Sequence, residues 1–358
     1  MRMKKLLIIA AAALLAAACA KTYEVKETTP PAIGFGTWTE QLTKARTAGS
    51  STFAANDVFK VEGIKNPGAS QTVVFNNTEV STTDGTSWTY TNTRYWDLDA
   101  TGYVFYAVSS PETTLTLVAD ANTTANNGTI AATSVTFSGE NNDILIADAV
   151  PVAPAAYGTP VALSFKHVGA LVDLKVKKTA NLDGSTVAIT AMQLEGIDGT
   201  ATFSVTGYSN NVPTVAWGVG DGNTTYTRTS GVTDVTLPTD VSSSEADNLI
   251  NTLVVMPQTL TDTKILKLSY TITDAAGNVN TFTDKSIKLN LFDNTDYPED
   301  DDTNTDGNQY NGGTKVTSWA AATHYIYTLT IDAKAISFTA SITGWATPAT
   351  NAYYYLVQ

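Results

Sequence analysis

The sequence is poor in the residues from which catalytic and metal sites are built. It has 358 residues but only one cysteine and two histidines, and 15% of its residues are charged. A single cysteine excludes an intramolecular disulfide and a Cys/His zinc set, so an exported chain must be held together by its core and its strand ladders. His167 and His324 stand in alternating stretches beside apolar or aromatic neighbours. This setting favours structural roles over general-base catalysis and predicts no catalytic residue.

Positive charge is also scarce. Lys and Arg total 21 against 34 Asp and Glu, which gives a net charge of -13 at pH 7. Loss of residues 1–46 would remove seven basic and three acidic side chains and bring the net charge to -17. Because nucleic-acid binding needs clustered Lys and Arg, the composition predicts no nucleic-acid partner.

Long helical periods are nearly absent, whereas threonine, tyrosine and valine are abundant. This composition is typical of an all-β chain, and short strands between Asn, Asp and Gly turns predict β-sandwich domains. In the first half, strands are expected at 57–62, 71–75, 87–91, 103–108, 135–137 and 143–147. A long strand is expected over 161–177, with a bulge at Gly169 where the alternation changes phase.

The second half repeats this pattern. Strands are expected at 186–194, 200–205, 251–258, 264–272, 281–289, 325–331 and 335–345. One helical turn is expected within 242–250, with Glu245 in its first turn. The polar stretch 178–185 predicts the domain boundary, and the Pro-rich stretch 151–160 is the alternative. The glycine-rich stretch 218–222 predicts a turn and not a phosphate loop, because no Lys-Ser/Thr pair follows it.

The amino terminus has the pattern of a secretory signal. Arg2, Lys4 and Lys5 precede an apolar run over 6–18, which is too short to span a bilayer as a mature helix. Cys19 follows Leu-Ala-Ala-Ala, which is similar to a bacterial lipobox except that the leucine stands one position early. We expect Cys19 to be lipidated rather than buried as a small hydrophobe. Since no aspartate follows the cysteine, the outer membrane is the expected destination.

The stretch 32–50 has the pattern of a short strand followed by an accessible tether. Ile33 and Phe35 alternate with glycines, and a polar run then leads to Arg46 and Thr47. One hypothesis is that this strand completes a sandwich in the precursor and is cut away after Arg46. The cut would leave a groove for another subunit's carboxyl-terminal strand. The alternative is an ordinary first strand with a solvated linker.

The last thirteen residues end in an alternating apolar pattern. On a strand, Tyr353, Tyr355 and Val357 would lie on one face and Tyr354 and Leu356 on the other. Burial of three to five of these side chains would contribute on the order of 10 kcal/mol before ordering costs. The pattern predicts a donor strand for another subunit, and the alternative is a final edge strand folded back on its own sheet.

An acidic insert over 298–313 is the candidate metal site. Asp302, Asn304 and Asp306 match the first half of an EF-hand-like calcium loop, but the twelfth position is Gly313 instead of a bidentate glutamate. Calcium binding and a solvated acidic loop are both compatible with half a motif. No other cofactor is expected.

A group of aromatic residues in the first half allows a different function. Trp88, Tyr90, Tyr95, Trp96 and Tyr103 are expected in adjoining strands, and aromatic faces suit sugar stacking as well as packing. If exposed, they would form a glycan-binding surface. The alternative function is therefore a surface glycan-binding β-sandwich lipoprotein that does not polymerise.

Several stretches, in this order, carry a resemblance to a known family. They are TKARTAG, LSFKHVGALVDLKV, TAMQLEGIDGTATFS, LVVMPQTL and HYIYTLTIDAKAISFTASITGW, preceded by the lipobox-like signal. Together they resemble the fimbrillin family, the type V pilins of Bacteroidales outer membranes, over nearly the whole chain.

The resemblance implies two tandem transthyretin-like β-sandwich domains in a lipoprotein precursor. The implied segments are a signal peptide over 1–18, a propeptide with the removable strand over 19–46, domains over 47–180 and 181–345, and a donated extension over 346–358. It also implies cleavage after Arg46 by an arginine-specific surface protease and strand exchange with other pilin subunits. The expected product is an outer-membrane fimbria that supports adhesion to a host or bacterial surface ligand.

Overall fold

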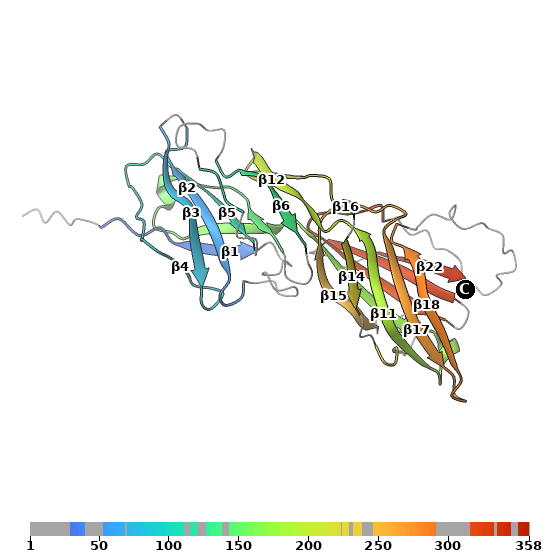
Figure 1. Cartoon of the computed structure of the whole chain (residues 1–358). Helices are drawn as coiled ribbons and strands as arrows, with labels where there is room; N and C mark the ends of the chain where they lie inside the picture. The colour runs from blue at the N-terminus through green and yellow to red at the C-terminus, as the bar shows by residue number, and fades with distance from the viewer. Residues whose placement is uncertain are drawn as a thin grey trace, which may run out of the picture.

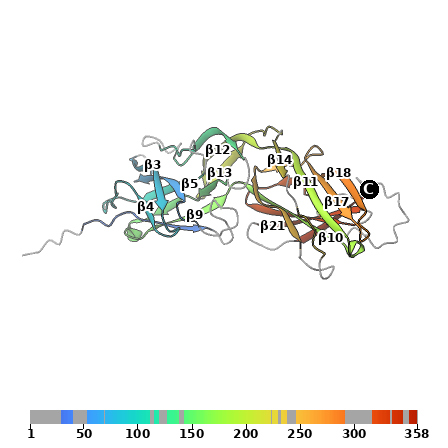
Figure 2. The same ribbon diagram turned by 60° about the horizontal axis from the view of Figure 1, so that its bottom comes forward.

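The protein is an elongated, almost entirely β-stranded molecule with two lobes (Figures 1 and 2). The computed structural model describes residues 29–39, 53–68, 70–110, 115–119, 127–137, 143–222, 224–228, 232–237, 246–290, 316–332, 335–344 and 350–357. The backbone alone is described for 38–39, 228, 251–252, 335–344 and 350–357. Two 3-10 turns, η1 (Pro154–Ala156) and η2 (Ala180–Leu182), interrupt the strands. The predicted all-β class is confirmed.

The first lobe is built on one eight-stranded sheet. Its order is β1-β9-β7-β5-β2-β3-β4, with β8 also paired to β5. The strands are β1 (Phe35–Thr39), β2 (Val58–Lys65), β3 (Thr72–Thr82), β4 (Trp88–Tyr90), β5 (Tyr103–Ser109), β7 (Leu145–Ala147), β8 (Val150–Val152) and β9 (Val161–His167). The sheet curls around an aromatic core until its edge strands approach each other, and Trp88 Nε1 donates to Thr37 Oγ1 at 3.0 Å.

A three-stranded sheet covers the outer face of this curled sheet. Its order is β13-β12-β6, formed by β6 (Ile130–Thr136), β12 (Thr200–Ser209) and β13 (Val212–Trp217). A second core, which includes Val108, Ile146 and Phe203, fills the space between the two sheets. The central strand β5 is therefore buried on both faces, which explains its almost continuous apolar sequence, YVFYAVS.

The second lobe is a sandwich of two sheets. One has the order β15-β10-β20-β21-β22, the other the order β14-β11-β17-β18, and a short pair, β16-β19, lies beside them. The strands are β10 (Ala170–Lys178), β11 (Thr186–Ile197), β14 (Thr224–Arg228), β15 (Asp247–Val255), β16 (Gln258–Thr259), β17 (Ile265–Thr273), β18 (Val279–Lys288), β19 (Ser318–Trp319), β20 (Thr323–Ile331), β21 (Ala335–Gly344) and β22 (Thr350–Val357). Alternate side chains of β17 point into the largest core, as the period of a half-buried strand requires.

The expected long strand over 161–177 is in fact two strands in two sheets. Strand β9 ends at His167 and belongs to the first lobe, whereas β10 begins at Ala170 and belongs to the second. A Cβ on Gly169 would lie 3.0 Å from Val254 Cγ1 and 3.3 Å from the Val255 carbonyl oxygen. The change of phase therefore marks the passage of the chain between lobes and not a bulge within one strand.

The strand pairing crosses the expected boundary near residue 180 in both directions. Strand β10, before this boundary, pairs with β15 and β20, and β12, after it, pairs with β6. Residues 247–250, within the expected helical turn, belong instead to strand β15. The Asp247 carboxylate accepts hydrogen bonds from the backbone and hydroxyl of Thr236, at 2.6 Å and 3.0 Å.

Buried ionisable groups accompany these strands. Glu62 on β2 is fully buried, and its Oε2 accepts a hydrogen bond of 2.7 Å from the Gly128 amide. Burial raises the pKa of Glu62 to about 8, although the Gly128 bond opposes this shift. The same burial, together with the charge of Glu62, raises the pKa of Tyr106 to about 12. Glu62 is therefore neutral over most of the physiological pH range.

Each histidine faces a carboxylate. His167 Nδ1 contacts Asp143 Oδ2 in the interior of the first lobe. His324 Nε2 lies 2.9 Å from Asp173 Oδ2, where β20 runs parallel to β10. Both pairs connect segments that are separate in the sequence. The structural roles of the two histidines stay a prediction.

Candidate functional site

The candidate site is the slot that holds residues 29–39 in the first lobe. Strand β1 is an edge strand that pairs in parallel with β9, from Phe35 opposite Val161 to Thr39 opposite Phe165. The Val161 amide extends this ladder with a 2.8 Å bond to the Gly34 carbonyl. Every other neighbouring pair in the sheet is antiparallel, so β1 joins the body as a separate addition to one edge.

Two side chains anchor the segment in the core. Ile33 is 1% exposed and Phe35 is 7% exposed. The Phe35 ring meets four aromatic rings, with centroid separations of 6.0 Å to Phe59, 5.4 Å to Phe75, 5.7 Å to Tyr90 and 5.9 Å to Phe105. All four contacts are edge-to-face, the arrangement that the ring quadrupoles favour.

On its other side the segment is held by separate hydrogen bonds and not by a ladder. The Tyr90 hydroxyl donates to the Ile33 carbonyl at 2.7 Å, and the Ile33 amide donates to the Arg94 carbonyl at 2.8 Å. The Trp96 amide donates to the Pro31 carbonyl at 3.0 Å. Partial burial raises the pKa of Tyr90. Its hydroxyl, like that of an unperturbed tyrosine, carries its proton at neutral pH and can donate this bond.

This geometry makes the segment separable. Its removal would uncover one edge of β9 and an aromatic trough beside Phe35. Burial of Ile33 and Phe35 contributes about 3 to 6 kcal/mol together, which the empty slot would forfeit. An uncovered edge of this kind readily accepts another strand.

The carboxyl-terminal strand has a similar position in the other lobe. Strand β22 lies at one edge of its sheet and pairs antiparallel with β21, with Ala335 opposite Val357 and Ile342 opposite Thr350. The expected donor residues, Tyr353 to Val357, belong to this strand. In the single chain the segment therefore folds back on its own sheet, as in the alternative interpretation of the tail.

Other predicted sites lie outside the described residues. These are the lipidation site Cys19, the cleavage pair Arg46 and Thr47, and the calcium candidates Asp302, Asn304 and Asp306. Within the described ranges, no group of three or more His, Cys, Asp or Glu side chains is placed to hold a metal ion. The same ranges contain no helix with the length and apolar character needed to cross a membrane.

The aromatic residues considered for glycan binding do not form an exposed surface. Trp96 and Tyr103 are 1% and 2% exposed, while Trp88 and Tyr90 pack against the first-lobe core. Only Tyr95 of this group is largely exposed. The expectation of a stacking surface here is wrong, because alternate positions of these strands face the interior of a curled sheet.

The sequence reasoning missed the walls of the slot. Phe59, Phe75 and Phe105 lie on expected strands, yet nothing in their spacing assigns them to Phe35. The one available signal in the sequence was that these phenylalanines stand at alternate positions of their strands, which predicts side chains that face the interior. Which strands become neighbours in the sheet depends on contacts between distant parts of the chain.

Comparison with known proteins gives a clear family match. A family model described as fimbrillin-like matches residues 43–345. None of the curated proteins is similar enough in sequence to match.

Solved structures provide more distant likenesses. A candidate cell adhesion protein from Bacteroides uniformis is 16% identical, with a TM-score of 0.47 and coverage of 88% of this chain and 98% of the other. A candidate cell adhesion protein from Bacteroides ovatus is 13% identical, with a TM-score of 0.45 and coverage of 92% and 99%. The tip fimbrial protein Mfa3 from Porphyromonas gingivalis, truncated at its carboxyl terminus, is 10% identical, with a TM-score of 0.39 and coverage of 88% and 100%.

Proposed function

The chain belongs to the fimbrillin-like family, and from this premise we propose that it is an outer-membrane fimbrial subunit that polymerises by strand exchange. The family match supports a fimbrial or adhesion role at the cell surface. In the proposed sequence of events, the chain is exported as a lipoprotein acylated at Cys19. An arginine-specific protease then cuts after Arg46, β1 departs, and a strand of another subunit fills its slot.

The observation that supports this proposal most directly is the attachment of β1. It pairs with one strand only and inserts the Phe35 ring into an aromatic trough, while Ile33, just before the strand, is buried beside it. Arg46 lies between β1 and β2 in the sequence. One cut there would therefore separate β1 from β2 and from every later strand.

The arrangement of the two lobes favours exchange between subunits. Strand β1 lies in the first lobe, and β22 lies near the far end of the second (Figures 1 and 2). A chain would therefore not fill its own slot with its own carboxyl-terminal strand. Donation from one subunit to the next is head-to-tail, and contacts of that kind generate filaments when they do not close into a ring.

Arg46→Ala is the test of this proposal. We expect the wild-type precursor, treated with an arginine-specific protease, to yield a product that begins at Thr47 and forms a ladder of stable multimers. Arg46→Ala should stay uncut and monomeric. Lys44→Ala is the matched control, because it removes a nearby positive charge but leaves the arginine, and it should be processed like the wild type.

Mass spectrometry of the amino terminus and electrophoresis of unheated samples provide the two readouts. Deletion of residues 353–358 should permit cleavage but abolish the multimers. Multimers of uncut Arg46→Ala, with β1 retained, would contradict strand exchange at this slot. Multimers of the tail deletion would contradict the assignment of the donor strand.

A further inference from the structure

A cavity of about 530 Å³ lies where the β12–β13 sheet meets the second lobe. Its lining comes from the end of β11, the loop between β13 and β14, and the segment between β15 and β17. This site is distinct from the slot of β1, and its interpretation does not depend on strand exchange. Its volume lies within the range of about 300 to 1,000 Å³ that is usual for small-ligand sites.

The loop over 218–222 forms a fixed wall of the cavity. The Gly218 amide donates to the Thr202 carbonyl at 2.8 Å, and the Asp221 amide donates to the Thr200 carbonyl at 3.2 Å. A Cβ on Gly220 would lie 2.4 Å from the Cβ of Asp198, so only glycine permits this close approach. The cavity is therefore preformed, and a ligand would not have to order this wall.

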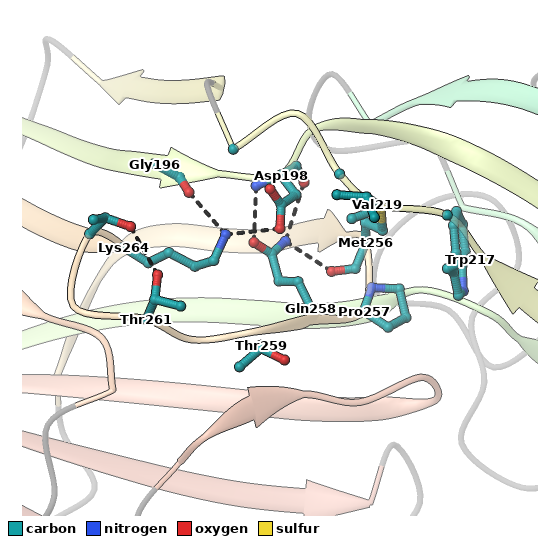
Figure 3. A pocket seen from close by; sticks show the side chains of 14 residues that line it. Gly196, Asp198, Trp217, Val219, Met256, Pro257, Gln258, Thr259, Thr261 and Lys264 are labelled. Atoms are coloured by element: carbon teal, nitrogen blue, oxygen red, sulfur yellow. Dashed lines mark hydrogen bonds and ion pairs between the residues drawn. The ribbon is translucent and has the colours of Figure 1, made fainter.

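Polar side chains form the floor of the cavity, and Figure 3 shows them converging around Asp198. Lys264 Nζ donates to Asp198 Oδ2 at 2.9 Å and to the Gly196 carbonyl at 3.0 Å. The Gln258 side chain accepts from the Asp198 amide at 3.0 Å and donates to the Asp198 and Met256 carbonyls at 3.2 Å and 3.0 Å. These bonds fix the amide and the carboxylate in defined orientations.

The rim adds hydroxyl groups and an aromatic ring. Thr259, Thr261 and Thr263 are exposed, and the hydroxyls of Thr261 and Thr263 lie 2.9 Å apart. Trp217 is half-buried at one end of the cavity, where it packs on Phe203 at 4.8 Å between ring centroids. The walls thus combine hydroxyl, amide and carboxylate groups with one indole ring.

The charge of the cavity selects among ligand classes. The single lysine in the lining is paired with Asp198, so it does not present an uncompensated cation to an anionic ligand. The chain as a whole carries a net charge of -13, which repels anions. We propose that this cavity binds a neutral carbohydrate, whose hydroxyls match the exposed threonine hydroxyls of the rim and the partly exposed Asp198 carboxylate, and whose ring face matches Trp217.

The test uses a printed array of neutral and anionic oligosaccharides, followed by saturation-transfer NMR with the neutral sugars that bind. We expect the full chain to bind neutral sugars and Thr261→Trp, which fills the cavity, to lower the affinity at least about tenfold. Thr283→Trp is the matched control, because Thr283 is also exposed but lies on β18, away from the cavity, and it should leave binding unchanged.

Thermal melts check the fold of each variant. If Thr261→Trp lowers the melting temperature, the test uses Thr261→Val and Thr263→Val instead. These smaller changes remove hydroxyls and should weaken binding without loss of stability. The proposal is overturned if the array detects no neutral sugar, if only anionic sugars bind, or if binding survives the cavity variants unchanged.

Discussion

Replacement of Phe35 by alanine tests the attachment of β1 most directly. The Phe35 ring is 7% exposed and meets four other rings, so truncation removes buried surface and leaves a cavity among aromatic side chains. Phe-to-Ala changes in cores cost about 3 to 5 kcal/mol, and β1, as an edge strand, allows some collapse. We therefore expect a loss of about 3 kcal/mol in the uncut precursor, which corresponds to a fall of about 10 °C in the melting temperature of the first lobe.

The position of Phe35 supplies an unusual control. Because this residue lies within the segment proposed to be discarded, wild-type and Phe35→Ala precursors should yield the same mature chain. Calorimetry before cleavage should separate the two proteins, and calorimetry of the purified mature products should not. Thr29→Ala, at an exposed position of the same segment, should leave both melts within about 0.5 kcal/mol of the wild type.

Two results would refute this reasoning. If the precursor tolerates Phe35→Ala without loss of stability, the aromatic trough does not anchor β1. If the difference persists after cleavage and purification, Phe35 remains part of the mature protein, and the segment is not discarded.

The remaining predictions concern buried positions of the first lobe. Since the folded-state pKa of Glu62 is raised from 4.5 to about 8, its contribution to stability is present below pH 4.5 and is lost as the pH rises toward 8. Glu62→Gln should remove this loss, which is on the order of 4 kcal/mol between pH 5 and 9. Urea unfolding at several pH values measures it, and the same change in the free energy of unfolding with pH in variant and wild type would contradict the prediction. Gly63→Ala should cost about 1 to 3 kcal/mol, because its Cβ would lie 2.8 Å from Phe75 and 2.9 Å from Phe105. Gly34→Ala, with no atom within 4 Å of the added carbon, is its control, and equal melting temperatures for the two variants would contradict the steric argument.

The sequence was sufficient for the fold class and for most strands. Alternation identified β2, β11, β17 and β20 to within a few residues, because one face of each strand packs on a core. The passage between the lobes at Gly169 was harder to predict. Both β9 and β10 are apolar, and only the sheets that they join show that the chain leaves one lobe there.

The candidate site shows the same limit. The alternation of Ile33 and Phe35 predicted a short strand, and the structure has one at residues 35–39. Its parallel pairing with β9 could not be predicted, because a parallel neighbour is brought together through more than a hundred intervening residues. The cavity at Asp198 was missed for a similar reason. Its lining is drawn from three segments, and the glycine-rich stretch 218–222 gave no ligand signal by itself.

The two terminal strands explain why a covalent cut could control assembly. In the intact chain, strand β1 covers one edge of β9 and strand β22 covers one edge of β21. While the chain still joins β1 to β2, any detached β1 returns in an intramolecular step, with an effective concentration that reaches the millimolar range for short linkers. A cut at Arg46 would remove this advantage, and the free segment would be diluted away. A strand of a neighbouring subunit would then need only contacts comparable to those of β1 to occupy the slot, because that strand stays tethered to a growing filament. On this reasoning, cleavage changes the competition between strands rather than the shape of the slot.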